Sequence, residues 1–258
     1  MNPVHDPNLT SKIQNLNFPL DLLLALIFPR DCSLCGEPSE SYDDGVVCAD
    51  CWHRSKKWLS LPISCLRCGW PAPRFDPTDV PSENCLRCRD YALDRLRMLG
   101  AYHGAMRAMA LNLKRQPFLP ARVLRLMEET FLKEGALSEV QCIVPVPLHA
   151  KREGERGFNQ AELLAEKVAR ITGLPCERRA LARKVETRRH RAGMDSRERN
   201  LSLKGAFTVV RPGAIRGRTV LLVDDVFTTG ATSNECARTL KSAGASRVCG
   251  FTLARVVD

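Results

Sequence analysis

The sequence predicts an α/β fold with a doubly wound parallel sheet, preceded by a small cysteine-rich module. Eight of the twelve cysteines and all three tryptophans lie before about residue 90. After that point apolar strand patterns alternate with helical patterns, which is typical of a parallel sheet covered by helices. The run 219–223, TVLLV, is continuously apolar, as expected for a strand buried on both faces of such a sheet.

The elements of the α/β part follow from periodicity and from breaker residues. In chain order we expect two helices within 102–135 separated by Pro117 and Pro120, a strand at 141–146, a helix at 159–171, the strand at 219–223, a helix at 232–243 and a strand at 247–253. Ligands of such sheets bind beyond the carboxyl ends of the strands. We expect an extension at 1–30, the cysteine module at 31–92 and the α/β domain at 93–258.

The composition is that of a globular protein with a positive surface. The chain has 258 residues, 44% hydrophobic and 26% charged, which argues against wholesale disorder. Its formal net charge of +10 favours anionic partners such as nucleotides, pyrophosphate or nucleic acid.

The most apolar stretch, 18–28, is too short for a membrane span. It is interrupted by Asp21, and about 20 apolar residues are needed to cross a bilayer. Pro29, Arg30 and a cysteine cluster follow where a signal peptide would need small residues for cleavage. We therefore expect a short helix that docks the cysteine module, and a cytoplasmic protein without a membrane span.

Two adjacent acids, Asp224 and Asp225, follow the buried strand at 219–223. Neighbouring carboxylates repel each other unless hydroxyl donors or a metal ion offset their charge, and the two hydroxyls of a ribose phosphate would serve. The strand is expected to deliver both acids to one ligand at its carboxyl end.

A loop rich in threonine leads from these acids into the next helix. Its amides and the hydroxyls of Thr228, Thr229 and Thr232 can converge on a monophosphate, which the helix dipole also favours. Gly230 would let the backbone approach that ligand closely because it has no Cβ. An ordinary strand–turn–helix with a solvated acidic pair is the alternative reading.

A cationic segment follows the strand at 141–146. We expect Lys151, Arg152 and Arg156 to lie on a proline-punctuated loop, where lysine and the forked donors of arginine suit a pyrophosphate. His149 is either a further donor to the pyrophosphate or a structural residue of the loop, and the structural role is the more common one for a lone histidine.

The segment 183–200 is polar and lacks the periodicity of a core element. From 178 to 199 there are nine Lys and Arg residues against three acids. This charge fits either a surface that binds a nucleic-acid backbone or a solvated flexible loop.

Eight cysteines form four CxxC pairs with the spacing of zinc ribbons. The ligand candidates are Cys32, Cys35, Cys48, Cys51, Cys65, Cys68, Cys85 and Cys88. They predict two structural Zn²⁺ ions, either one per consecutive pair of CxxC motifs or in a crossed arrangement. The other four cysteines lie in strand or helix patterns and are expected in the core.

The tryptophans of the module have two readings. Trp52, Trp58 and Trp70 lie among lysines and arginines and would suit stacking on single-stranded bases. Packing in so small a module explains them equally well, and we expect packing.

Several of these segments resemble one known family. The stretch 220–232, VLLVDDVFTTGAT, resembles the phosphoribosyl pyrophosphate signature of type I phosphoribosyltransferases, with Phe227 where a branched aliphatic is usual. The wording PVPLHxxRxxxRGFNQ from Pro145 to Gln160 and the helix YHGAMRAMALNLKR from Tyr102 to Arg115 look like the competence-related ComF family. The chain is thus identified as a member of that family, with a type I phosphoribosyltransferase-like sheet and a double zinc ribbon.

The resemblance implies roles for individual residues. The ligands of phosphoribosyl pyrophosphate would be Asp224, Asp225, Val226, Phe227, Thr228, Thr229, Gly230, Ala231, Thr232, Lys151, Arg152 and Arg156. Asp224, Asp225 and Arg152 would be catalytic. A flexible loop that closes over the ligand would use Arg183, Thr187, His190, Arg197 and Asn200, with His190 at the position of the usual glutamine.

The family implies a phosphoribosyltransferase that uses Mg²⁺ and is linked to DNA uptake and use, with an acceptor that the sequence does not identify. The alternative is a non-catalytic protein that handles single-stranded DNA and is regulated by phosphoribosyl pyrophosphate. A pure adaptor for competence or DNA-processing proteins is the third reading.

Overall fold

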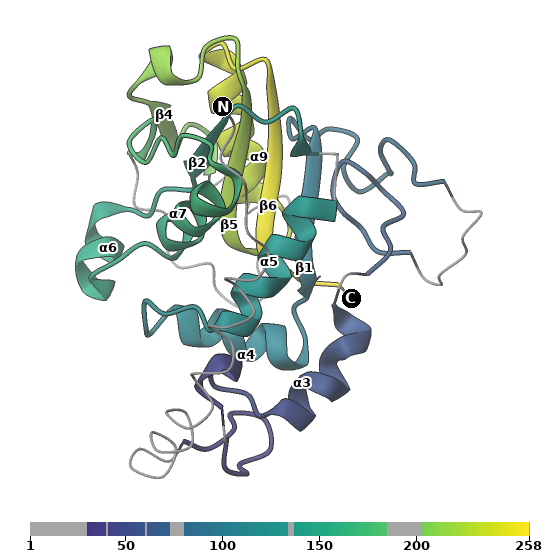
Figure 1. Ribbon diagram of the computed structural model, residues 1–258. Helices are drawn as coiled ribbons and strands as arrows, with labels where there is room; N and C mark the ends of the chain where they lie inside the picture. Colours follow the sequence, from purple (N-terminus) through teal and green to yellow (C-terminus); the bar gives the residue numbers. More distant parts are fainter. Residues whose placement is uncertain are drawn as a thin grey trace, which may run out of the picture.

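The computed structural model describes residues 30–39, 41–59, 61–72, 80–133, 137–184 and 203–257 (Figure 1). The helix expected at 18–28 lies outside these ranges. Within them, no helix has the length and apolar character that crossing a membrane requires.

The described elements comprise a cysteine-rich part followed by alternating strands and helices. In chain order they are η1 (Tyr42–Asp44), α3 (Ala49–Ser55), η2 (Lys56–Trp58), β1 (Arg95–Ala101), α4 (Gly104–Leu113), α5 (Ala121–Lys133), β2 (Cys142–Pro145), α6 (Ala150–Arg156), α7 (Gln160–Thr172), β3 (Leu181–Arg183), β4 (Phe207–Val209), η4 (Pro212–Ala214), β5 (Thr219–Phe227), α9 (Ala231–Ser242) and β6 (Arg247–Arg255).

The central sheet has four parallel strands in the order β1-β6-β5-β2. Helices α4, α5 and α7 pack with one face of this sheet, and α9 packs with the other (Figure 1). The predicted α/β class with a doubly wound parallel sheet is therefore confirmed. The ends expected for the helices and strands agree with the structure to within a few residues, except for β5.

Side chains of β5 alternate between the two layers of the core. Leu221 and Val223 pack with α4, α5 and α7, whereas Val220 and Leu222 pack with α9. Because successive residues of a strand point to opposite faces, the two acids that follow start from alternate positions of the strand.

Strand β1 and the short antiparallel pair β3–β4 were not predicted from the sequence. In β1, Arg95 and Arg97 interrupt the apolar pattern that marks a buried strand. Arg97 is nevertheless buried, and its guanidinium donates to the carbonyl of Leu96 at 3.0 Å. Tertiary contacts therefore override the local pattern at this edge of the sheet.

The first part of the cysteine module docks on α4 and α5. Trp52 is buried, and its indole N–H donates to the carbonyl oxygen of Asp44 at 2.9 Å. The carboxylate of Asp44 pairs with Arg122 of α5 at 2.5 Å, and the hydroxyl of Ser55 accepts from the amide of Ala105 at 3.0 Å. Trp52 thus fills a core, as expected.

The second part of the module docks on β1 and β6. The amide of Leu96 donates to the carbonyl of Leu66 at 3.2 Å. Two guanidinium groups lie over the ring of Trp70, that of Arg87 at 4.0 Å and that of Arg255 at 5.0 Å from the ring centroid. The second part of the module therefore reaches the end of β6, next to the carboxyl end of β5.

Candidate functional site

The acidic pair lies within β5, not after it. We expected the strand to end at residue 223, but it continues to Phe227 and pairs with β6 as far as Arg255. The polar residues did not end the strand because the ladder to β6 holds their backbone extended. Their backbone positions alternate across the strand, yet the two carboxyl groups lie close enough to interact. After burial, the charge of Asp225 and a side-chain hydrogen bond to it raise the pKa of Asp224.

Asp225 faces the α4 layer. Its carboxylate lies 3.6 Å from the ammonium of Lys114, just after the end of α4, and both side chains are largely shielded from solvent. Thr252 of β6 donates its hydroxyl to the Asp225 carbonyl at 3.0 Å. The structure thus gives one acid a cationic partner from the stretch that resembles the ComF helix.

Asp224 faces the α9 layer and lines a small pocket with the loop that follows the strand. Burial, and then the neighbouring charge of Asp225, raise the pKa of Asp224 well above its usual range, while Lys114 acts in the opposite direction. A carboxyl group in this environment gains from any ligand that brings hydroxyl donors or positive charge.

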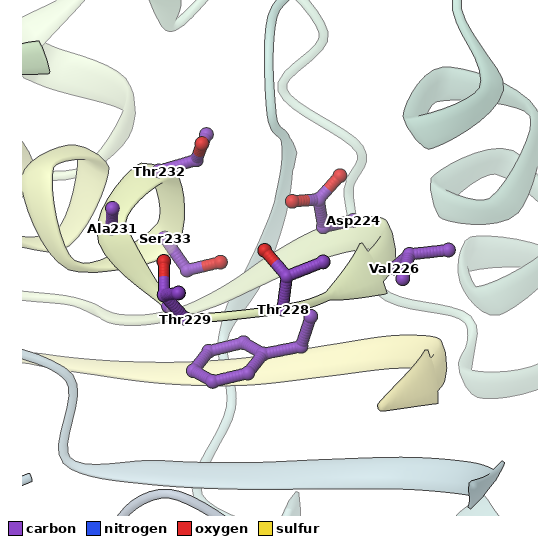
Figure 2. Close-up of a pocket in the computed structure, with 9 residues that line it drawn as sticks. Asp224, Val226, Thr228, Thr229, Ala231, Thr232 and Ser233 are labelled. Atoms are coloured by element: carbon purple, nitrogen blue, oxygen red, sulfur yellow. The ribbon is translucent and has the colours of Figure 1, made fainter. Parts of the chain in front are cut away.

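The threonine loop, residues 228–232, forms the rest of this pocket. Figure 2 shows the carboxylate of Asp224 on the same side of the strand end as the side chains of Thr228 and Thr232. Helix α9 begins at Ala231, so its free N-terminal amides and the positive end of its dipole border the pocket. The arrangement has the donors that a phosphate needs.

Gly230 has a packing role that the sequence did not reveal. Its φ is +77°, a left-handed conformation that glycine adopts without strain. A Cβ there would overlap Cζ of Phe227 and come within 2.9 Å of Oη of Tyr91. The ring of Phe227 is buried beneath the loop, so the packing of the protein itself already requires glycine at this position.

We therefore expect Gly230→Ala to disturb the threonine loop through a clash with the Phe227 ring. The left-handed φ and the overlap with Phe227 should together lower the free energy of unfolding by about 1–3 kcal/mol. Urea unfolding measures this change. Gly213→Ala is the control, because a Cβ at Gly213 meets nothing within 4 Å and its φ is not positive; equal losses in both variants would contradict the packing role.

The expected cationic loop is a short helix. Lys151, Arg152 and Arg156 all lie on α6, which begins after His149 and ends at Gly157 in a left-handed conformation. The prolines precede the helix, and the segment AKREGER contains good helix formers, which outweigh the loop signal. The Nδ1 of His149 accepts from the amide of Lys151 at 3.3 Å, so His149 has the structural role, as an N-cap.

The sequence RGFNQ joins α6 to α7 through specific contacts. The side chain of Asn159 caps α7 by accepting from the amide of Ala161 at 3.0 Å, and it donates to the carbonyl of Val146 after β2 at 3.1 Å. Arg156 donates to the Oε1 of Gln160 at 2.9 Å. These contacts fix the direction of α6 relative to the end of β2.

Arg183 lies within electrostatic reach of both Arg152 and Asp224. Burial lowers the pKa of Arg183, the charge of Arg152 lowers it further, and the charge of Asp224 raises it. The two cations come from α6 and from the end of β3, far apart in the sequence. The structure thus brings together one residue of each of the three segments that the sequence singled out. The other four residues expected in the flexible loop, Thr187, His190, Arg197 and Asn200, lie outside the described residues.

The eight candidate ligands form two four-cysteine sites. In the first cysteine site (Cys32, Cys35, Cys48, Cys51) and the second cysteine site (Cys65, Cys68, Cys85, Cys88), all sulfur atoms lie within 4.8 Å of one another. The consecutive arrangement is therefore correct, and the crossed alternative is excluded.

The sulfur geometry suits Zn²⁺. The Sγ atoms of Cys65 and Cys88 are 3.5 Å apart, and those of Cys68 and Cys85 are 3.8 Å apart. The edge of a tetrahedron with Zn–S bonds of about 2.3 Å is about 3.8 Å. Four thiolates leave no open coordination position, so both sites are structural.

Backbone amides support the thiolate form in the first cysteine site. Burial raises the pKa of Cys32, but the amides of Cys48 and Leu34 outweigh this effect, and the pKa falls to about 6. These amides lie 3.3 and 3.5 Å from the sulfur. Of the four cysteines expected in the core, Cys142, Cys236 and Cys249 are buried and Cys176 is half-buried.

Sequence reasoning missed three residues at the site. Lys114 appeared only as part of a family-like helix, without a partner. Tyr91 donates its hydroxyl to the carbonyl of Thr229, and Arg255 donates to the carbonyl of Cys68 at 2.5 Å. No local pattern marks them, because their partners lie 138 and 187 residues away.

Comparison with known proteins agrees with both parts of the chain. Residues 23–90 match the double zinc ribbon domain model. The DNA utilization protein YhgH of Salmonella typhimurium is 31% identical over 90% of this chain and 100% of its own length. Competence protein F of Haemophilus influenzae is 32% identical over 67% of this chain and 77% of its own length.

Solved structures with similar folds match in part. The glutamine phosphoribosylpyrophosphate amidotransferase of B. subtilis is 22% identical, with a TM-score of 0.34 over 50% of this chain and 26% of its own. The adenine phosphoribosyltransferase of Saccharomyces cerevisiae is 14% identical, with a TM-score of 0.35 over 54% of this chain and 71% of its own.

Proposed function

Because this chain belongs to the family of the competence protein F and DNA utilization protein YhgH relatives, we propose that it binds phosphoribosyl pyrophosphate and transfers the 5-phosphoribosyl group to an amine or a nucleobase. The observation that carries the proposal is the pocket that Asp224 shares with the threonine loop at the start of α9. A carboxylate beside a phosphate cradle matches a sugar phosphate, which presents hydroxyl donors and a dianion a few ångströms apart.

Each end of the ligand would meet a different part of the site. The 5-phosphate would accept from the amides and hydroxyls of the threonine loop, and the ribose hydroxyls would donate to Asp224. Asp225, held by Lys114, would contact the ligand beside Asp224. The pyrophosphate would lie toward α6 and β3, where Arg152 and Arg183 supply positive charge.

In the transfer step, the bond from ribose C1 to the pyrophosphate oxygen breaks, and the lone pair of the acceptor nitrogen forms a new bond to C1. The pyrophosphate leaves with the bonding electron pair, and the acceptor nitrogen loses a proton. Arg152 and Arg183 would stabilise the departing charge. Mg²⁺ bound to the pyrophosphate would neutralise more of it.

Calorimetry of the full chain with phosphoribosyl pyrophosphate and Mg²⁺ tests the proposal. Thr228→Val should weaken binding roughly tenfold, because it removes a donor to a charged phosphate. Thr239→Val is the matched control, because the Thr239 hydroxyl bonds to the Glu235 carbonyl within α9; its affinity should equal that of the wild type. An absence of binding heat in the wild-type chain would refute the proposal. Once binding is detected, an assay of pyrophosphate release across candidate acceptors tests the transfer step.

A second candidate function is the handling of single-stranded DNA, with phosphoribosyl pyrophosphate as a regulator. The names of the relatives, which refer to competence and DNA utilization, and the net charge of +10 favour it. It predicts an affinity for single-stranded DNA that falls steeply with salt and no release of pyrophosphate.

A further inference from the structure

The second cysteine site lies next to the threonine loop and is connected to it by two routes. The first route passes through Tyr91. Its amide donates to the carbonyl of Cys88, a ligand of the site, at 2.9 Å. Its hydroxyl donates to the carbonyl of Thr229, in the loop. One residue thus bonds to a metal ligand with its backbone and to the loop with its side chain.

The second route passes through Arg255 at the end of β6. Its Nη1 donates to the carbonyl of Cys68 at 2.5 Å. Its guanidinium lies over two rings, 5.0 Å from the centroid of Trp70 and 4.7 Å from that of Phe227. Phe227 in turn supports Gly230 from below. The backbone of the second site therefore reaches the underside of the loop through a stack of side chains.

Charge explains why an arginine occupies this interior position. Four thiolates around Zn²⁺ carry a net charge of −2, and Arg255 is 4% exposed beside them. Its Nε has no hydrogen-bond partner among the residues that the structure describes. A buried cation of this kind is stable only beside compensating negative charge, which the second site supplies when its cysteines are ionised.

The geometry points to Tyr91 and Arg255 as positioning residues that make the shape of the threonine loop depend on the metal in the second cysteine site. The first cysteine site differs, since it docks on α4 and α5 through Asp44, Trp52 and Ser55. The role in ligand affinity rests on the proposed function, whereas the role in loop geometry does not.

Thermodynamic linkage predicts a second effect, on the affinity of the second cysteine site for metal. If metal in the second site raises the affinity of the loop for its ligand, the ligand must raise the affinity of that site for metal by the same factor. Ligand should therefore slow the loss of one zinc ion of the two, and a purely structural Tyr91 would not transmit this effect.

Tyr91→Phe in the full zinc-loaded chain is the test, with Tyr42→Phe as the control. Tyr42 belongs to the module of the first site, and its ring stacks with Arg30. Both variants should keep two zinc ions, because neither tyrosine is a ligand. In hydrogen exchange, peptides covering 227–233 should exchange about tenfold faster in Tyr91→Phe and at the wild-type rate in Tyr42→Phe.

Zinc release to a chromogenic chelator measures the linkage, with phosphoribosyl pyrophosphate and Mg²⁺ as the probe. The ligand should slow the release of one zinc ion in the wild type, and Tyr91→Phe should reduce this protection about tenfold. Cys85→Ser and Cys35→Ser each remove one ligand, from the second and first sites. Faster exchange of the loop is expected in Cys85→Ser alone.

Wild-type exchange of the loop in Tyr91→Phe, or equal loop exchange in the two serine variants, would overturn the inference. If the wild-type chain binds no phosphoribosyl pyrophosphate, the proposed function fails, and the exchange measurements still decide the role of Tyr91. If Cys85→Ser does not fold, Tyr91→Phe decides alone.

Discussion

Removal of zinc with a strong chelator is expected to unfold the second cysteine site and its surroundings completely. The buried cluster of this module consists of Cys65, Cys68 and Cys88, with Trp70 and Tyr91 packed against it. Its core is thus made of its own metal ligands, which repel each other when ionised and have no apolar substitute. Structural zinc contributes about 10–16 kcal/mol to folding in small zinc modules, which is more than the packing of Trp70 and Tyr91 can supply at roughly 1.5–3 kcal/mol for each large side chain.

The loss should appear as rapid proteolysis within 61–92 and a changed tryptophan fluorescence, both restored by adding zinc. Cys65→Ala tests the same point genetically and should lose one zinc ion per chain. Cys249→Ala is the control, because Cys249 is equally buried but lies in β6. A chain that resists protease equally with and without zinc would show that zinc binding by these four cysteines does not stabilise the module.

The first cysteine site should be less sensitive to the same treatment. Trp52 and Val47 belong to the core that also contains Met106 and Met109 of α4. Burial of these side chains stabilises the module independently of its metal, at roughly 1.5–3 kcal/mol for each large side chain. Two sites with the same ligands therefore differ in how much their surroundings depend on zinc.

The sequence was sufficient for the features that depend on local pattern. The parallel sheet followed from apolar runs such as 219–223, and the zinc sites followed from CxxC spacing. In both cases the physical cause acts over a few residues: a strand buried on both faces must be apolar, and a CxxC turn brings two sulfurs to one ion. The structure places both features as predicted.

Features that depend on distant contacts could not be read in this way. The extension of β5 through Asp224 and Asp225 depends on its pairing with β6, and the need for Gly230 depends on the Phe227 ring beneath it. The α6 helix was missed because prolines next to a cationic segment suggested a loop, although they stand just before the helix. The residues that connect the zinc module to the loop are visible only once the chain is folded.

Asp224→Asn is expected to stabilise the chain while it weakens ligand binding. The raised pKa of Asp224 means that the native state holds this proton more tightly than the unfolded state, whose aspartate titrates near 3.9. The native state therefore loses stability as the pH rises from about 4 through the folded pKa, and the full penalty applies above it. Asparagine carries no such penalty, so the gain should be near zero at about pH 4 and reach about 1 kcal/mol above the folded pKa.

Binding should change in the opposite direction. Loss of a charged acceptor for the ribose hydroxyls should weaken the binding of phosphoribosyl pyrophosphate by roughly ten- to a hundredfold, since hydrogen bonds to charged groups contribute about 1.5–3 kcal/mol. Urea unfolding between pH 4 and 8, together with calorimetry, measures both effects. Asp225→Asn provides the contrast, because it breaks the ion pair with Lys114, worth up to about 1 kcal/mol, and at the same time relieves part of the repulsion on Asp224. Its net gain in stability should therefore be smaller than that of Asp224→Asn. If both variants lost stability equally, the ionised form of Asp224 would not be destabilised in the native state. A carboxyl group that already has its hydrogen-bond partners gains little from a sugar hydroxyl, so the proposed contact between Asp224 and the ribose would then lose its support.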